Sequence, residues 1–375
     1  MPRHSFARPL CSGLLVCSVT LLGLLLVSHF CHAQVTNSLV QGKFVPTLEA
    51  LPHIVLPHST FKGWCGQKDR FLLNVNGQLE AYDASVKSST IAVSSSWPFQ
   101  CSVDGQQLVY VDTRMGYITK IDIASGAARQ LGSYQVRETN GASPSFSPDL
   151  QKVASDRPLQ LTADAGNLTV IPVNSSGKEN LRDIKWSDDS SKLFVAYFTA
   201  IEVFDANGGK IGSGSLPKGS YFRDGWFDAN GEALFLYLAL DSDESGPGLL
   251  IKCRIGDWKC DRPRSKVAAV SVGGRGIVGT IVPQGKAQTP AENDDSTQIY
   301  DKYAAELRDR ASNVLARETL VTATGRTDFK LRVAPSGKKA ILTWYIPPTA
   351  ECRPPDGRSS YCEQGMMIDL AKVVK

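Results

Sequence analysis

Short apolar runs separated by polar turns recur along this chain about every forty residues, a spacing found in several repeat architectures. Cys101–Leu131 shows the pattern most clearly, with strand-length apolar runs around a Ser-x-Asp-Gly turn and an Ala-Ser-Gly turn. Such turns supply the positive φ required between antiparallel strands. Phe71–Leu73 is apolar on both faces, whereas Ile118–Ile123 alternates. Strands and tight turns at this spacing predict a β-propeller, in which small sheets surround an axis.

The copies of this pattern predict an all-β chain with a single β-propeller domain over residues 34–375. We expect seven blades of four antiparallel strands, and six blades if Val267–Leu320 is an insertion. The segment 35–56 is expected to add a strand to the last blade and close the ring, because an open ring leaves unpaired strand edges. The expected blades span approximately 64–93, 97–131, 144–181, 184–216, 224–262, 265–320 and 329–375.

The region of the sixth repeat can be interpreted in two ways. Apolar residues between Tyr300 and Leu315 have helical spacing, yet Glu306–Leu320 aligns with Lys120–Leu131 through a shared Ala-Ser turn and a closing leucine. We therefore expect a strand, a turn and a second strand. The polar segment Pro283–Ser296 is expected to form a long exposed loop.

Residues 1–33 have the composition of a secretory signal peptide. Arg3 and Arg8 precede the apolar run Leu14–Phe30, and Cys31–Ala33 fits the small-x-small cleavage rule. An uncleaved membrane anchor is the alternative, although the run is short for a span. No later stretch is long and apolar enough to cross a bilayer. We expect a soluble, monomeric protein in the periplasm or outside the cell.

The charge of the mature chain gives no reason to expect nucleic acid as a partner. The formal net charge is +4, and removing Arg3 and Arg8 lowers it to +2. A nearly neutral surface does not favour nucleic acid or anionic membranes.

Six cysteines remain after the signal peptide, an even number that suits disulfides in an oxidising compartment. Cys65 and Cys101 fall at matching positions of adjacent repeats, where innermost strands crowd together, so a bond between them is expected. Cys253 and Cys260 flank a predicted Gly-Asp turn, and Cys352 and Cys362 bracket a loop rich in Pro and Gly. Zinc is the competing interpretation, but no pair has the CxxC spacing of zinc sites.

The Ser-x-Asp-Gly turns, and strands of the form Ile-x-x-Ile-Asp-x-x-x-Gly before a closing leucine, resemble the TolB-like, WD-repeat-like propellers of bacterial envelope proteins. The resemblance covers most of 64–370 and is specific in Cys101–Leu131, Phe146–Ile171 and Trp186–Asp205. It implies a secreted or periplasmic propeller that binds partners and has no chemistry of its own. The six cysteines and the lack of an amino-terminal TolB domain depart from that family, so a role in envelope integrity is not carried over.

The sequence contains no recognisable catalytic constellation. His53 and His58 are the only histidines after the signal peptide, and both lie outside the repeats. A Ser-His-Asp or Cys-His arrangement needs a histidine as base, and no GxSxG turn is present. We expect no cofactor and no catalytic residue.

Two weaker candidates for binding remain. Asp241, Asp243 and Glu244 form the best candidate calcium loop, although a solvated connector is the simpler interpretation. The tryptophans could line a sugar cleft, although several occupy the packing position of the repeat; they are residues 64, 97, 186, 226, 258 and 344.

The sequence therefore predicts an exported, non-catalytic propeller that acts as a binding or scaffold module for an unknown protein or glycan. The alternative is a carbohydrate-active enzyme with a carboxylate pair in the axial channel. Inward-facing Asp or Glu beside exposed Trp would favour the enzyme, and a channel of small and apolar side chains would contradict it.

Overall fold

The computed structural model describes most of the chain outside its first 37 residues. The chain divides into two compact units, and the unit Val35–Lys375 holds all the strands. The described residues are 38–40, 43–56, 59–75, 77–83, 88–94, 98–112, 115–133, 144–155, 160–163, 169–172, 181–240, 247–261, 266–288, 299–309, 312–321, 329–346 and 362–374.

The described part of the chain is all-β, as the alternating pattern predicts. Its single helical element is a short 3-10 turn at Gly274–Gly276, and its other elements are strands. Among these residues no helix has the length and apolar character needed to cross a membrane. The prediction of an all-β chain is confirmed.

The strands form seven four-stranded antiparallel sheets and one two-stranded hairpin, β1 (Ser38–Val40) with β2 (Lys43–Val45). We number the sheets 1 to 7 in chain order. Sheet 1 comprises β4 (Thr60–Cys65), β5 (Arg70–Val75), β6 (Gln78–Tyr82) and β7 (Ser88–Ser94). Sheet 2 comprises β8 (Phe99–Cys101), β9 (Gln107–Asp112), β10 (Tyr117–Asp122) and β11 (Ala128–Ser133). Sheet 3 comprises β12 (Ser145–Phe146), β13 (Lys152–Ser155), β14 (Gln160–Ala163) and β15 (Thr169–Pro172).

Sheets 4 to 7 complete the arrangement. Sheet 4 comprises β16 (Leu181–Trp186), β17 (Lys192–Tyr197), β18 (Ala200–Asp205) and β19 (Lys210–Ser215), and sheet 5 comprises β20 (Ser220–Phe227), β21 (Ala233–Leu240), β22 (Gly248–Arg254) and β23 (Lys266–Val267). Sheet 6 comprises β24 (Ala269–Val272), β25 (Val278–Gln288), β26 (Ile299–Arg308) and β27 (Val314–Val321). Sheet 7 comprises β28 (Lys330–Val333), β29 (Lys339–Ile346), β30 (Cys362–Asp369) and β3 (His53–Val55).

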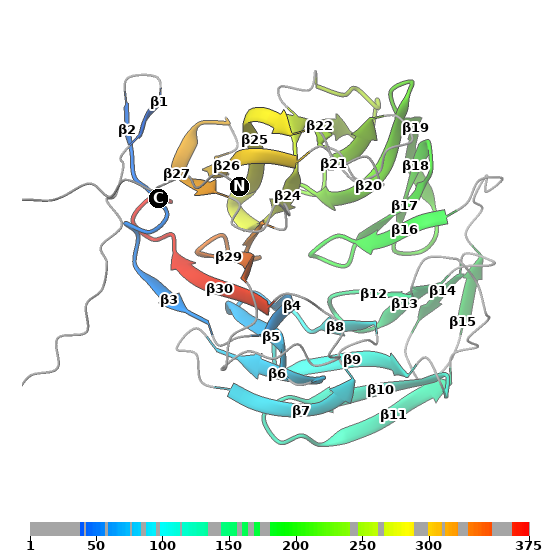
Figure 1. The fold of residues 1–375 in the computed structure, drawn as a ribbon. Helices are drawn as coiled ribbons and strands as arrows, with labels where there is room; N and C mark the ends of the chain where they lie inside the picture. Colours follow the sequence, from blue (N-terminus) through cyan, green and yellow to red (C-terminus); the bar gives the residue numbers. More distant parts are fainter. Residues whose placement is uncertain are drawn as a thin grey trace, which may run out of the picture. The chain divides into compact units, whose positions relative to one another are not determined.

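In sheets 1 to 6 the strands pair in chain order, so each sheet is a meander. Sheet 7 takes its fourth strand from near the start of the chain, because β3 pairs with β30 through His53 opposite Ile368 and Val55 opposite Met366. The sheets follow one another around a centre, as expected for a β-propeller (Figure 1).

Each sheet contacts the next one along the chain. The Cys65–Cys101 disulfide joins sheets 1 and 2, and the packing of Val109 with Phe146 joins sheets 2 and 3. A hydrogen bond from Trp186 Nε1 to the Ser145 carbonyl joins sheets 3 and 4, and one from Lys192 Nζ to the Gly231 carbonyl joins sheets 4 and 5. Sheets 5 and 6 meet where β23 contacts β25, and a hydrogen bond from the Val333 N–H to Ser271 Oγ joins sheets 6 and 7. Sheet 7 also contacts sheet 1, because Ser336 Oγ donates to Asp69 Oδ1.

The hydrophobic core lies between neighbouring sheets. Phe194 in sheet 4 and Leu236 in sheet 5 belong to one cluster, and both are completely buried. Phe71 in sheet 1 and Ile341 in sheet 7 belong to another cluster. Burying each such side chain stabilises the fold by about 1.5–3 kcal/mol, which explains why the inner strands are apolar on both faces.

The turn between the first and second strands recurs with nearly the same geometry. Its first residue in sheets 2, 3 and 4 is Ser102, Ser147 or Ser187, and each hydroxyl donates to an aspartate two residues later at 2.5, 2.5 and 2.6 Å. Each turn also contains a residue with positive φ before the second strand. These residues are Asp69, Gly105, Leu150, Ser190, Gly231, Gly276 and Gly337.

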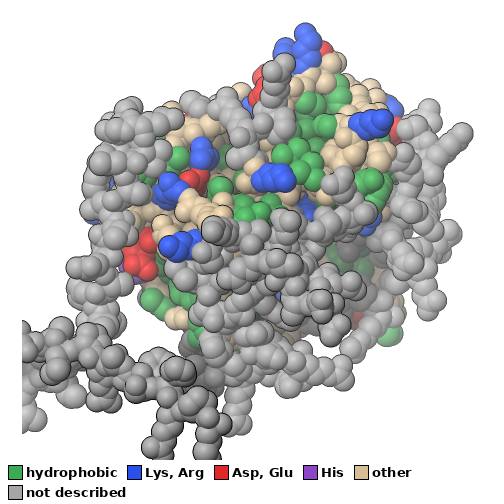
Figure 2. Space-filling view, turned by 45° about the horizontal axis from the view of Figure 1, so that its top comes forward, with side chains coloured by type: hydrophobic (Ala, Val, Ile, Leu, Met, Phe, Trp, Pro, Cys, Tyr) green, Lys and Arg blue, Asp and Glu red, His purple; other side chains and the backbone are tan. Residues whose placement is uncertain are grey.

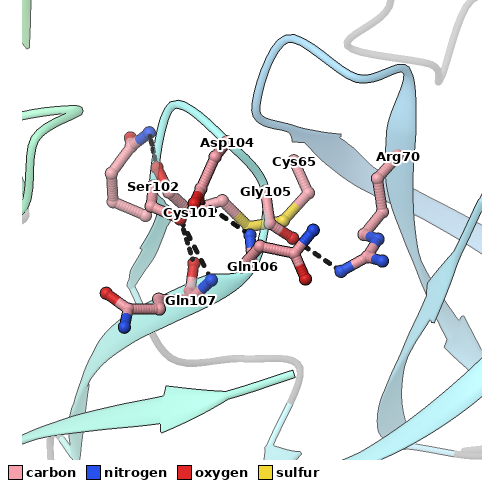
Figure 3. The surroundings of a disulfide bond; sticks show 9 residues. Cys65, Arg70, Cys101, Ser102, Asp104, Gly105, Gln106 and Gln107 are labelled. Carbon is pink, nitrogen blue, oxygen red and sulfur yellow. Dashed lines mark hydrogen bonds between the residues drawn. A yellow bond between two sulfur atoms is a disulfide. The ribbon is translucent and has the colours of Figure 1, made fainter. Parts of the chain in front are cut away.

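The disulfide between Cys65 and Cys101 joins the ends of β4 and β8, with 5.1 Å between the α-carbons. Figure 3 shows the turn of sheet 2 packed beside it, where Arg70 Nη1 donates to the Gly105 carbonyl at 2.6 Å. The pairing expected from the repeat alignment is confirmed, because equivalent ends of innermost strands lie side by side.

A second disulfide joins Cys253 to Cys260 across the end of the β22 hairpin. Cys362 also takes part in a disulfide, while Cys352 lies outside the described residues. The hairpin predicted around Cys253 and Cys260 is therefore present.

The sixth repeat contains strands, as predicted, because β26 and β27 pair along their lengths. The loop predicted from Pro283 is wrong for its first part, since β25 continues to Gln288. Pro283 lies opposite Tyr303, and a register irregularity between Gln284 and Ala287 accommodates the extension. Residues 289–298 lie outside the described part.

Candidate functional site

The three metal candidates found in the sequence cannot be compared with the structure. Asp241, Asp243 and Glu244 lie outside the described residues, as does His58. His53 lies on β3, where its Nδ1 is 3.0 Å from the Leu51 carbonyl oxygen. Within the described ranges, no group of three or more His, Cys, Asp and Glu side chains could hold a metal ion.

A cavity of about 310 Å³ opens between the first strands of sheets 5, 6 and 7. First strands of adjacent sheets contact each other near the centre, so their early residues converge on one end of the axis. The lining contains three cationic side chains and one carboxylate among apolar groups. It consists of Arg223, Asp224, Tyr237, Ala268, Ala269, Val270, Lys330, Leu331 and Arg332.

Two of the cations lie over aromatic rings. The Arg223 Cζ atom is 5.3 Å from the Tyr237 ring centroid, and Arg223 Nη1 donates to the Tyr237 hydroxyl at 2.9 Å. The Arg332 Cζ atom is 4.9 Å from the Phe61 centroid in sheet 1. A guanidinium attracted to the face of a ring is restricted in the orientations that it can adopt. Both residues are therefore oriented before any ligand binds.

The positive charge of the cavity is only partly balanced by its surroundings. In the described part of the structure, neither Lys330 nor Arg332 forms an ion pair with a carboxylate. Burial lowers the pKa of the Arg332 guanidinium, while Glu363 and Tyr345 oppose this shift. Arginine stays charged in proteins, so the cavity remains cationic. Figure 2 shows Lys and Arg side chains set among hydrophobic ones on one face of the molecule.

An ion-pair cluster joins the first strands of sheets 4 and 5. Lys185 Nζ donates to Asp224 Oδ1 and lies 3.3 Å from Asp183 Oδ2. Burial favours loss of the Lys185 proton, but the two carboxylates outweigh it and raise the pKa of Lys185. Lys185 is thus an ammonium at neutral pH. Burial also raises the pKa of the Tyr237 phenol, which therefore stays protonated.

A second, smaller cavity of about 90 Å³ lies toward the other ends of these strands. Lys185, Trp186, Asp188 and Trp226 are among the residues that line it. The Lys185–Asp224 ion pair connects the two linings, because Lys185 faces the small cavity and Asp224 the large one. Burial, with a smaller contribution from Asp189, raises the pKa of the Asp188 carboxyl.

The tryptophans that the structure describes do not assemble into one sugar cleft. Trp186 and Trp226 share the small cavity, whereas Trp64 packs at 5.7 Å from Phe61 and at 6.0 Å from Phe71. The Nε1 atom of Trp258 donates to the Ser215 carbonyl. Trp344 packs against the core of sheets 6 and 7, and Trp97 lies outside the described residues.

Sequence reasoning missed Arg223, Lys330 and Arg332 as a group. Arg223 lies on β20, two sheets before β28, which carries both Lys330 and Arg332. The only signal for them is a charged residue in an innermost strand, where both faces are otherwise apolar. The condition stated for the enzyme alternative, inward-facing Asp or Glu beside exposed Trp, is different, because this lining has one carboxylate, Asp224, and no tryptophan.

No known family matches the sequence, and no curated protein is similar to it in sequence. The fold is similar to solved structures. An oligogalacturonate lyase in complex with manganese superposes with a TM-score of 0.56 and 12% identity, over 87% of this chain and 98% of that one. An oligogalacturonate lyase from Vibrio parahaemolyticus superposes with a TM-score of 0.54 and 10% identity, over 89% of this chain and 96% of that one. The Myceliophteria thermophila Cps50 (Swd1) β-propeller domain superposes with a TM-score of 0.53 and 11% identity, over 84% of this chain and 98% of that one.

These comparisons correct the expectation of a non-catalytic protein. Two of the similar structures are lyases, so absence of a Ser-His-Asp or Cys-His arrangement does not argue against an enzyme on this architecture. The expectation rested on histidine-dependent chemistry, which carboxylate and guanidinium groups do not need. At these identities the similarity shows the fold alone: the chain is a β-propeller of four-stranded antiparallel sheets.

Proposed function

We propose that this protein is a carbohydrate-active propeller that binds and cleaves an acidic oligosaccharide at the cavity lined by Arg223, Lys330 and Arg332. The observation that carries the proposal is the lining itself, with three cations around one carboxylate in about 310 Å³. This volume suits a small ligand. Guanidinium groups pair with carboxylates through parallel hydrogen bonds, so a uronate ring is the saccharide that fits. The lyase structures of similar fold act, by name, on oligogalacturonate.

The proposal includes the architecture and location of the protein. We infer that the seven sheets are seven blades of one ring, closed by β3 in sheet 7; the pairing of β3 with β30 and the contact of Ser336 with Asp69 support this. We also propose that residues 1–33 are a cleaved signal peptide and that the protein is exported. The two disulfides support an oxidising compartment.

Asp224 is the residue that we assign as the base. Its Oδ1 is held by Lys185 and by the Gly225 N–H, while Oδ2 has no hydrogen bond from the described residues. In the proposed elimination, Oδ2 takes the proton on the carbon next to the uronate carboxylate. The C–H electron pair forms a C=C bond, the C–O bond to the next sugar breaks, and the departing oxygen takes a proton from water. Pairing the uronate with Arg223 and Arg332 acidifies that carbon.

A divalent metal ion does not fit this lining. Three cations surround the single carboxylate, and the described residues hold no group of three or more metal-binding side chains. Manganese occurs in one of the similar lyases, but no step of the proposed reaction passes through a metal.

The test uses the mature protein with defined oligogalacturonates. Calorimetry measures binding, and ultraviolet absorbance detects the C=C bond of the product. We expect binding that weakens with salt, because exposed charges are screened. Arg332→Ala should weaken binding at least tenfold, and Asp224→Asn should keep binding and abolish product. Arg129→Ala, an exposed change on β11, is the matched control.

The outcomes separate the parts of the proposal. Absence of binding by the folded protein, or equal binding by wild type and Arg332→Ala, would overturn the site. Binding without product would overturn the elimination step and leave a saccharide-binding module.

A further inference from the structure

Beside the cationic cavity lies an aromatic ledge formed by Phe198 and Tyr221. The two ring centroids are 4.4 Å apart with the planes tilted by 41°, and both side chains are half-buried. The Arg182 guanidinium covers Phe198, with its Cζ atom 4.4 Å from the ring centroid. We call these three residues the platform.

The platform repeats the chemistry of the cavity on the neighbouring sheet. Arg223 over Tyr237 and Arg332 over Phe61 are guanidinium groups on aromatic rings, and Arg182 over Phe198 is a third. Arg182 occupies the same place in β16 as Arg223 in β20, at the register irregularity between the first and second strands, and Arg332 lines the same cavity as Arg223. The three guanidinium groups therefore lie at the same end of the axis, on sheets 4, 5 and 7.

The platform is continuous with the cavity through β20. Tyr221 precedes Arg223 by two residues on this strand, which places their α-carbons about 7 Å apart. Asp183, the neighbour of Arg182, contacts Lys185, and Lys185 contacts the cavity residue Asp224. The two ion pairs of Lys185 therefore link the strand that carries Arg182 to the cavity lining.

The platform is fixed before a ligand arrives. Phe198 lies in the turn between β17 and β18, and its carbonyl accepts the Phe222 N–H of β20 at 3.1 Å. The adjacent Thr199 carbonyl accepts the Leu216 N–H at 2.8 Å. One backbone hydrogen bond thus joins the turn to β20, the strand that carries Tyr221, and the second joins it to the segment that follows β19. A preorganised surface loses little entropy on binding.

We propose that the platform is a second subsite, which binds the adjacent uronate ring of the same acidic chain. The Tyr221 ring would stack on the sugar face, and Arg182 would pair with its carboxylate. This inference rests on the proposed function. The second subsite adds to that function that the ligand is an oligomer rather than a single uronic acid.

The test compares ligand lengths. Calorimetry would measure the affinity of galacturonic acid, its dimer and its trimer for wild type, Arg182→Ala and Tyr221→Ala. The control is Tyr117→Ala, which alters a tyrosine on β10 that is 39% exposed. Wild type should bind the trimer more tightly than the monomer. The two platform variants should each lose about tenfold in trimer affinity and leave monomer affinity unchanged.

Rescue distinguishes recognition from folding. Tyr221→Phe keeps the ring and should restore trimer affinity, while melting temperatures establish that each variant is folded. Equal losses for monomer and trimer, or no loss for the trimer, would overturn the second subsite while the cavity stands. If no length binds, the proposed function is wrong and the subsite with it.

Discussion

The carbonyl oxygen of Cys65 lies against Gly105, so that a Cβ atom added to this glycine would come within 2.6 Å of it. Gly105 also has a φ of +68°, and its own carbonyl accepts a hydrogen bond from the Arg70 guanidinium. The glycine is therefore required twice, by the backbone conformation and by the close approach of sheets 1 and 2.

Replacing Gly105 by alanine should destabilise the protein by about 2–4 kcal/mol, which combines about 1 kcal/mol for the left-handed backbone with the cost of relieving the contact. Gly126→Ala is the matched control, because Gly126 has a φ of +70° but nothing within 4 Å of its added Cβ. It should cost only about 1 kcal/mol. Urea unfolding measures both variants. Equal losses would mean that the contact with Cys65 does not constrain the turn.

Of the disulfides, the two whose cysteines are both described should differ in how much stability their removal costs. The Cys65–Cys101 bond spans 36 residues, whereas the Cys253–Cys260 bond spans 7. The chain-entropy model gives about 4 kcal/mol for the longer loop and about 2.5 kcal/mol for the shorter one. Denaturant unfolding of Cys65→Ala/Cys101→Ala and Cys253→Ala/Cys260→Ala compares them. A larger loss for the hairpin bond would contradict this order.

The Ser–Asp turns should contribute to stability according to their burial. Ser147 is completely buried, and its hydroxyl donates to Asp149 and accepts the Lys152 N–H. Ser147→Ala leaves buried polar groups without this partner and should cost about 1–3 kcal/mol. Ser125→Ala removes a similar bond to Asp122 in an exposed turn, and should cost about 0.5 kcal/mol or less. Thermal melting of the two variants tests the difference.

Two carboxyl groups should give opposite dependences of stability on pH. The Ser102 hydroxyl and then the Gln106 N–H lower the pKa of Asp104. Its contribution to stability is therefore present above the unfolded pKa of about 3.9 and lost as pH falls through the lower folded value. Asp104→Asn should melt below wild type at pH 7, and the gap should close in acid.

Burial raises the pKa of Glu318, more than the Glu49 N–H lowers it. The unfolded chain ionises first, so stability falls as pH rises from about 4.3 through the raised folded pKa. Glu318→Gln should therefore melt above wild type at pH 7 and equal to it below pH 4. If both variants shift with pH in the same direction, one of the two assignments is wrong.

Much of the fold could be predicted because its determinants are local. The Ser-x-Asp-Gly turns, the apolar first and second strands and the strand assignment of Tyr303–Leu320 depend on residues close together in the sequence. The extension of β25 past Pro283 could not be predicted, because pairing with a remote segment of β26 overrides the local preference of proline. Positive φ at Leu150 and Ser190 was not predicted for a different reason, since neither residue type favours that conformation by itself.

By itself the sequence determined the repeat, the all-β class and the Cys65–Cys101 pairing, because equivalent positions of a repeat acquire equivalent places in the structure. Only the tertiary structure decided the candidate site. Arg223 is far in the chain from Lys330 and Arg332, and the three meet where first strands converge on the axis. The side of an innermost strand that faces the axis is set by packing between sheets, and the sequence period of a single strand does not record it.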